Sequence, residues 1–161
     1  MDKIEELLKN PQTDLQKQAL TDKSYKKTPN NQDCKINFEL ATYGDAILKC
    51  ALCKIYFERE NKDNFGFKGK LTEWKKQYES DEVLIKFIAR HYDILNFLNF
   101  DSGDTKKPQD YKYEDKNAKR RYKYIATAME ACIAAVYLEN GENEVIEIVK
   151  QWIQWIDESK S

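Results

Sequence analysis

The chain is poor in the residues that end helices and form tight turns. Its 161 residues include five glycines and three prolines. Sandwiches and barrels built from many short strands depend on frequent turns that contain these residues, so the composition disfavours them. The abundance of Leu, Ile, Lys and Glu favours helices. We therefore predict an all-α fold, formed by a single domain over residues 1–161.

The chain also lacks an excess of charge of either sign. It carries 27 basic and 28 acidic residues, for a formal net charge of −1. A surface that is basic overall is therefore excluded, and nucleic-acid binding would require a local patch. One such patch is KNAKRRYKY, in which Lys119, Arg120 and Arg121 are candidate phosphate contacts. The alternative is that this cluster is only the solvated start of a helix.

Residues typical of zinc, redox and histidine-based chemistry are scarce. Cys50 and Cys53 form a C-x-x-C pattern within an apolar helical run, but no second pair follows at zinc-ligand spacing. We therefore expect buried, free thiols. The single histidine, His91, is expected to be a structural or surface residue.

The chain has no long apolar run and no leader-like start. Met1 is followed by an acidic and basic amphipathic stretch, which is not typical of a signal peptide. No segment is apolar over the length that a bilayer requires. We therefore expect a cytoplasmic protein without membrane contact.

Apolar spacing predicts a series of helices around one central, mostly buried helix. The central one spans residues 36–57, where the pattern is almost continuously apolar. Exposed loops are predicted over residues 26–34 and 101–117. The other predicted helices cover residues 1–10, 14–25 capped by Asp14, 71–78, a helix capped by Ser80, 118–138, and a last amphipathic helix after Gly141.

Two of these apolar runs each contain one carboxylate. They are Asp45 in FELATYGDAILKCALCKIYF and Glu130 in YIATAMEACIAAVYL, and neither run has a nearby arginine. A buried, ionised acid costs several kcal/mol unless it is compensated. If the two helices pack together, the acids share a crevice suited to a hydrated Mg²⁺ ion. The alternatives are a helix-capping role for Asp45 after Gly44, and a tyrosine or lysine partner for Glu130.

Five segments in the right order resemble the catalytic domain of ribonuclease III. QALTDKSY resembles the early A-L-T-H-x-S-Y segment, and FELATYGDAIL resembles the signature L-E-F-L-G-D-A-V-L. Asn30 and Asn31 precede the signature, as two asparagines do in the family. GKLTEWKKQYESDEVLIKFIARHYDILNFL resembles the family's middle segment, and ATAMEACIAAVYLENG resembles the late A-D-A-x-E-A segment. The resemblance implies a compact helical endonuclease fold that cuts double-stranded or structured RNA with Mg²⁺, or with Mn²⁺.

The family's acidic active site is only partly present. Carried over by position, the signature aspartate is Asp45 and the late glutamate is Glu130, which the resemblance implies as catalytic and metal-binding residues. The other family acids fall on Ala41, Lys68 and Thr127. The short form called mini-ribonuclease III has a similar pattern, which favours activity from Asp45 and Glu130 alone. The alternative is an impaired site kept in a structural, RNA-binding or ribonucleoprotein-binding module.

The resemblance also implies a homodimer. Family members pair through the signature helix, so we expect its apolar residues to supply the dimer surface. No double-stranded-RNA-binding domain is expected, so specificity would depend on a particular folded RNA or on a protein or ribonucleoprotein partner. The expected dimer residues are Ile47, Leu48, Ala51, Leu52 and Ile55.

Overall fold

The computed structural model describes residues 1–27, 29–59, 70–100 and 122–161. Within these ranges the regular structure is helical, apart from one isolated parallel bridge between Thr21 and Asn99. This confirms the all-α prediction. The elements are α1 (Lys3–Lys9), α2 (Asp14–Ala19), η1 (Lys23–Lys27), η2 (Pro29–Asn31), α3 (Phe38–Arg59), α4 (Lys70–Glu79), α5 (Asp81–Val83), η4 (Leu84–Ala89), α6 (Arg90–Tyr92), η5 (Ile94–Asn96), α8 (Lys123–Asn140) and α9 (Glu142–Lys160).

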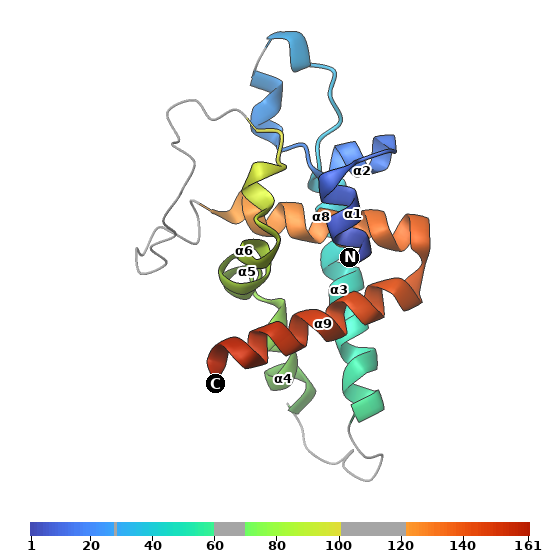
Figure 1. The fold of residues 1–161 in the computed structure, drawn as a ribbon, viewed down its shortest axis with the longest axis vertical. Coiled ribbons are helices and arrows are strands. Elements are labelled where there is room, and N and C mark those ends of the chain that lie inside the picture. The colour runs from blue at the N-terminus through green and yellow to red at the C-terminus, as the bar shows by residue number, and fades with distance from the viewer. Residues whose placement is uncertain (28, 60–69, 101–121) are drawn as a thin grey trace.

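The centre of the fold is the crossing of α3 and α8 (Figure 1). The two helices approach backbone to backbone at Gly44. A Cβ atom built at this position would lie 1.7 Å from the carbonyl oxygen of Glu130, so any side chain here would force the helices apart. Glycine is therefore required at this crossing because of close approach.

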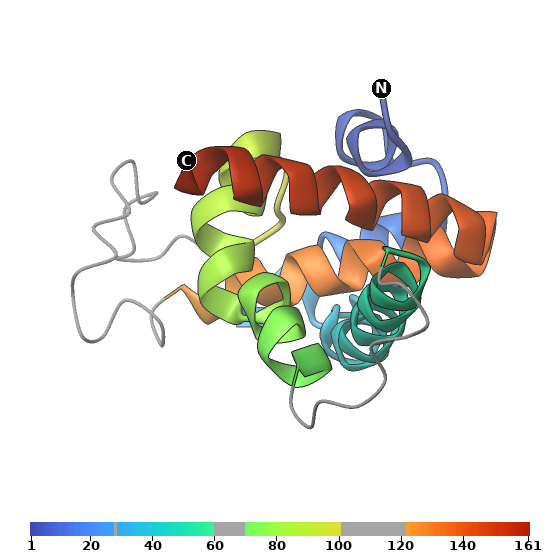
Figure 2. The ribbon, with the colours of Figure 1, turned by 90° about the horizontal axis from the view of Figure 1, so that it is seen from below.

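Helices α8 and α9 form a hairpin that α3 crosses, as the two views in Figures 1 and 2 agree. Gly141 makes the turn between them with a φ of 88°, and its N–H donates to the Tyr137 carbonyl at 2.9 Å. Since a positive φ is strained for other residues, glycine ends α8 here as predicted. The apolar stripe of α9 is buried as expected, at Val145, Ile148, Val149, Trp152, Ile153 and Ile156.

A chain of hydrogen bonds connects the two ends of the protein. The Tyr92 hydroxyl donates to Asp2 at 2.7 Å and accepts from the indole N–H of Trp152 at 2.9 Å. Asp2 also caps α1, because its carboxylate accepts from the Glu5 N–H at 2.9 Å. The first helix, the segment that ends in α6, and the last helix are therefore joined at one point.

Several predicted boundaries differ from the structure. Thr13, not Asp14, caps α2, since its hydroxyl accepts from the Gln16 N–H at 3.1 Å. The loop predicted over residues 26–34 contains short 3₁₀ turns, because turns of this type connect helices at little cost. Ser80 does cap α5, whose helix continues through the π-helical turn η4. The predicted start of α8 at Ala118 and the loop over 101–117 lie outside the described residues.

The apolar residues assigned to the dimer surface are buried inside the chain. Ile47, Leu48, Ala51, Leu52 and Ile55 all belong to the hydrophobic core. That assignment was wrong because α8 and α9 already cover this face of α3.

The four thiols differ in their exposure. Cys132 is buried, but Cys50 is exposed and Cys34 and Cys53 are half-buried, so the expectation of buried thiols holds for one of the four. Cys50 was misjudged because it lies on the solvent side of a long helix.

The histidine and the helix lengths match their expectations. His91 is exposed and stacks on Trp155 with ring centroids 3.5 Å apart, in keeping with a surface or structural role. Among the described helices, none is both long and apolar enough to cross a membrane.

Candidate active site

Asp45 and Glu130 line the same cavity, which has a volume of about 960 Å³. Asp45 directly follows Gly44, and Gly44 rests on the backbone of Glu130. The helix crossing therefore brings together two acids that are far apart in the sequence. Their roles in catalysis and metal binding stay predictions.

The Glu130 carboxyl has an unusual proton affinity. Burial raises its pKa to about 8, and the charges of Asp45 and Asp81 act in the same direction, while Lys49 and Lys123 oppose them. No described side chain donates a hydrogen bond to this carboxyl. The tyrosine or lysine partner considered from the sequence is therefore not found among the described residues. Perturbed groups of this kind are common in functional sites.

Asp45, in contrast, has a cationic partner. The Nζ atom of Lys49 lies 2.6 Å from its Oδ2 atom, one helical turn along α3. This interaction raises the pKa of Lys49, chiefly through the hydrogen bond to Asp45. The sequence analysis noted that Asp45 lacks a nearby arginine but did not identify Lys49 as its partner, although the i, i+4 spacing of an acid and a lysine was visible.

The ion pair of Asp45 and Lys49 is partly exposed to solvent. The side chains are 36% and 42% exposed, respectively. Pairs with this exposure contribute about 0–1 kcal/mol, because water screens them and holding two side chains costs entropy. Lys49 can therefore leave Asp45 at small cost when a more strongly bound cation arrives.

A third carboxylate, Asp81, lines the cavity and was missed by the sequence analysis. It is the first residue of α5, directly after the cap at Ser80. The Ser-Asp-Glu sequence indicated a helix start, but it could not show that this helix end faces the two acids. Among the described residues, however, no three His, Cys, Asp or Glu side chains lie close enough to hold an ion together.

The positions of the absent family acids supply no carboxylate here. Ala41 lines the cavity with a methyl group, and the Thr127 hydroxyl donates to the Lys123 carbonyl at 3.0 Å. Lys68 lies outside the described residues. The described carboxylates of the cavity are therefore Asp22 and the three discussed above.

Cations and aromatic rings complete the lining. Lys23 and Lys27 come from η1 and Lys123 from the start of α8. The sequence analysis missed Lys23 and Lys27, whereas Lys123 belongs to the basic cluster KNAKRRYKY that it singled out. The other candidates of that cluster, Lys119, Arg120 and Arg121, lie outside the described residues. The aromatic residues of the cavity are Phe38, Phe100 and Tyr124.

Asn37 fixes the position of η1 relative to α3. It is fully buried, its N–H donates to the Thr21 carbonyl at 3.0 Å, and its side-chain amide donates to the Ala19 carbonyl at 3.2 Å. These bonds join the end of α2 to the start of α3. As a result, Lys23 lies beside Phe38, with its Nζ atom 5.4 Å from the ring centroid. The only sign of this arrangement in the sequence was the position of Asn37, a polar residue directly before the long apolar run of α3.

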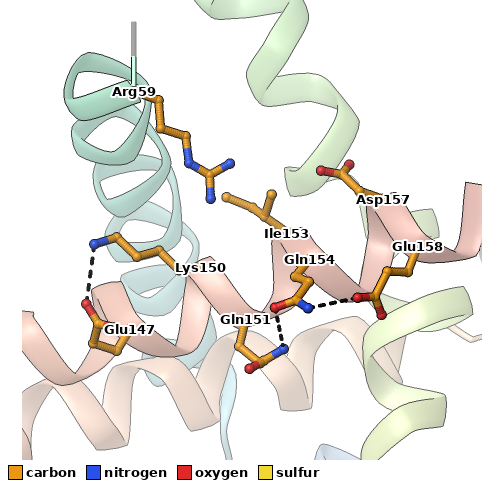
Figure 3. Close-up of a pocket in the computed structure, with 8 residues that line it drawn as sticks. All are labelled: Arg59, Glu147, Lys150, Gln151, Ile153, Gln154, Asp157 and Glu158. Atoms are coloured by element: carbon orange, nitrogen blue, oxygen red, sulfur yellow. Dashed lines mark hydrogen bonds and ion pairs between the residues drawn. The ribbon is translucent and has the colours of Figure 1, made fainter.

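A second groove lies between the end of α3 and α9 (Figure 3). Its polar groups largely pair with one another. Lys150 contacts Glu147 at 3.3 Å and Glu58 at 3.4 Å, and Gln154 donates to Glu158 at 2.8 Å. Asp157 accepts from the Tyr78 hydroxyl at 2.9 Å. This arrangement is typical of a solvated structural network.

The comparisons with known proteins agree with this geometry. A family model described as Ribonuclease-III-like matches residues 12–155. Ribonuclease 3 of Histophilus somni (strain 2336) is 28% identical over 156 residues, which cover 96% of this chain and 61% of that protein. Ribonuclease 3 of Azotobacter vinelandii (strain DJ) is 31% identical over 140 residues, which cover 87% and 52%. The chain thus spans about half to three fifths of the length of these relatives.

A comparison with solved structures also found a ribonuclease III domain. It is described as the nuclease domain of ribonuclease III from Campylobacter jejuni, with structural flexibility in a region involved in dimer formation. The TM-score is 0.68 at 25% identity, and the match covers 94% of each chain. With the family model covering most of its length, the chain belongs to the ribonuclease-III-like family.

Proposed function

We propose that this chain is a divalent-metal-dependent endoribonuclease that cleaves double-stranded or structured RNA. The observation that carries the proposal is the meeting of Asp45 and Glu130 at the crossing of α3 and α8, in a cavity that also holds three lysines. Acids and cations in one cavity suit a reaction in which a metal ion and a phosphodiester must lie side by side. Family membership supports the same reaction class.

The donor set fits a hard divalent ion. Asp45 and Glu130 supply carboxylate oxygens, the ligands that Mg²⁺ and Mn²⁺ prefer, and Glu130 lacks a described hydrogen-bond donor. These two residues would hold the ion, with Asp81 near enough to act through its charge. When bound, the ion supplies an activated water and stabilises negative charge on the phosphate.

Before a metal ion can bind, the side chains of Glu130 and Lys49 must change their present state. Because the pKa of Glu130 is about 8, this carboxyl is mostly protonated at neutral pH and must release its proton to become a ligand. Lys49 must leave the Asp45 oxygen, which its partial exposure permits. Lys23, Lys27 and Lys123 remain available in the cavity to neutralise the RNA backbone.

A second candidate function is a non-catalytic module that binds RNA or a ribonucleoprotein. The ion pair of Lys49 with Asp45 favours it, since a lysine already satisfies one of the two predicted ligands. The absence of carboxylates at Ala41 and Thr127 favours it as well. In such a module, the three lysines of the cavity would bind RNA, and the RNA would not be cleaved.

We also propose that the chain forms a homodimer, through a different face of α3 from the one expected. An exposed stripe of Tyr43, Ala46, Cys50 and Phe57 follows helical spacing on the solvent side of this helix. Exposed apolar stripes of this kind are typical of interfaces. The C. jejuni nuclease domain is described as having a region involved in dimer formation, which supports a homodimer here, while the choice of face rests on the exposed stripe alone. A cytoplasmic location and a protein partner stay predictions.

Cleavage of a labelled RNA hairpin in Mg²⁺ or Mn²⁺ tests the proposed function. We expect the wild-type chain to cut, and Asp45→Asn and Glu130→Gln each to reduce the rate at least 100-fold. Glu139→Gln is the matched control, because Glu139 lies on the exposed side of the same helix as Glu130. If the wild-type chain binds the hairpin but cuts it with neither ion, the enzyme proposal fails and the non-catalytic module is favoured.

A further inference from the structure

One exposed ring in the cavity contributes little to the stability of the fold. Phe38 is the first residue of α3, its side chain is 45% exposed, and it lines the same cavity as the two acids. A large apolar side chain that remains in contact with water gains little from folding. Its position in a cavity, rather than on a convex surface, makes it available to a ligand.

The other aromatic residues extend this apolar wall. Phe100 and Tyr124 pack with ring centroids 5.8 Å apart and planes inclined by 37°. Both rings line the cavity together with Phe38. The cavity therefore offers flat, apolar surface close to its acids.

Cations accompany these rings. Lys23 and Lys27 are exposed residues of η1 that line the cavity, and the Nζ atom of Lys23 lies over the Phe38 ring. No ion pair joins either lysine to a described carboxylate within 4 Å. Aromatic rings beside cations are the composition of grooves that bind single-stranded nucleic acid, where bases stack and phosphates contact lysines.

A perfect duplex cannot use this aromatic surface. In double-stranded RNA the faces of the bases are covered by their neighbours, and a protein reaches only phosphates, 2′-hydroxyls and groove edges. An unpaired nucleotide, in contrast, presents a base face. The volume of about 960 Å³ lies at the upper end of the range for small-molecule sites, roughly 300–1,000 Å³, so one nucleotide fits.

We propose that this cavity binds an unpaired nucleotide of the RNA beside the phosphate to be cut, with the base against Phe38 and a phosphate on Lys23 and Lys27. This inference rests on the proposed function and adds a substrate preference to it. The preferred RNA is a helix interrupted by a bulged or looped-out residue. A fully paired helix reaches the lysines and the acids but leaves the rings uncovered.

Binding to two matched RNAs tests the proposal. One is a fully paired, fluorescently labelled hairpin, and the other is the same hairpin with one unpaired nucleotide inserted. Affinities are measured by anisotropy in Ca²⁺, with product formation followed in the same samples. Since stacking one base on an aromatic ring is worth about 1–3 kcal/mol, we expect the wild-type chain to prefer the bulged RNA at least fivefold.

Variants of two exposed apolar residues make the test specific. Phe38→Ala should abolish the preference, and Phe38→Trp should keep it. Leu138→Ala should keep it too, since Leu138 is 51% exposed and does not line the cavity. Because the readout is a ratio of two affinities, a general effect on folding or dimerisation cancels.

Three results would overturn the inference: equal affinity of the wild-type chain for both RNAs, no binding of either, or a preference that survives in Phe38→Ala. If the two RNAs bind equally and both are cut in Mg²⁺, the nuclease proposal stands and only the preference for an unpaired nucleotide fails.

Discussion

The cavity at the crossing of α3 and α8 and the groove along α9 both contain acids and cations, yet they differ in how the charges are arranged. In the groove, Lys150 contacts two acids and the other described polar groups are mostly hydrogen bonded to one another. In the cavity, Glu130 is desolvated beside other acids, and its pKa rises to about 8. The number of charged groups therefore says less about function than whether those groups are already satisfied.

The largest effect should come from breaking the helix crossing itself. Replacing Gly44 with alanine places a methyl group 1.7 Å from the Glu130 carbonyl oxygen, so α3 and α8 must separate. We expect a loss of about 3 kcal/mol or more in the free energy of unfolding, measured by urea denaturation. Gln151→Ala in the α9 groove should change it by less than about 0.5 kcal/mol. A Gly44→Ala variant as stable as the wild type would contradict the close approach.

The second prediction uses pH to separate the two regions. Glu130 binds its proton more tightly when folded, with a pKa of about 8 against the ordinary 4.5. Its contribution to stability is therefore complete below pH 4.5 and is lost as the pH rises through 8. Glu130→Gln removes this loss and should be more stable than the wild type above pH 8 by on the order of 1–2 kcal/mol.

Gln151→Ala is the control for this experiment. Gln151 lies in the α9 groove and has no titratable group, so its replacement should leave the pH profile of stability unchanged. Denaturant melts of the three proteins between pH 4 and pH 9 provide the measurement. Parallel profiles for the wild type and Glu130→Gln would show that this carboxyl is not desolvated.

The third prediction concerns the competition between Lys49 and a metal ion for Asp45. Lys49→Met removes the cation 2.6 Å from the Asp45 oxygen, so Mn²⁺ should bind several-fold more tightly, as measured by the paramagnetic resonance signal of free Mn²⁺. Lys150→Met removes a similarly exposed, paired lysine from the groove and should change nothing. If Mn²⁺ affinity is unaffected by Lys49→Met, Asp45 is not a ligand.

The smallest expected effect comes from the lysines of η1. Replacing Lys23 and Lys27 with alanine removes two phosphate contacts, so the slope of log K against log salt should become shallower by about 1 to 2 units. The paired change of Lys9 and Lys17, exposed residues that do not line the cavity, should leave the slope unaltered. Equal slopes for both double variants would remove η1 from the RNA contact surface.

The sequence predicted the helices and the pairing of two acids better than it predicted their surroundings. Apolar spacing located α3, α8 and α9, because burial of one face fixes a helical period. The resemblance to ribonuclease III then identified Asp45 and Glu130. Asp81 and Phe38 were missed because their importance depends on which helix ends face the cavity, and that is decided by tertiary packing.

The sequence also could not predict which apolar residues of α3 are exposed. Composition indicated that this helix has more apolar residues than a single stripe, but not which of them face solvent. The core uses Leu48, Leu52 and Ile55, and leaves Tyr43 and Phe57 exposed. Only the packing of α8 and α9 against one side distinguishes the two sets.

The hydrogen bonds from Tyr92 to Asp2 and from Trp152 to Tyr92 have a consequence for synthesis on the ribosome. Trp152 lies in α9, so these hydrogen bonds cannot form until α9 has been translated. The apolar side of α3 must likewise wait for α8 and α9 to cover it. Until these two helices emerge, that side of α3 stays exposed, and exposed apolar surface in a nascent chain favours aggregation.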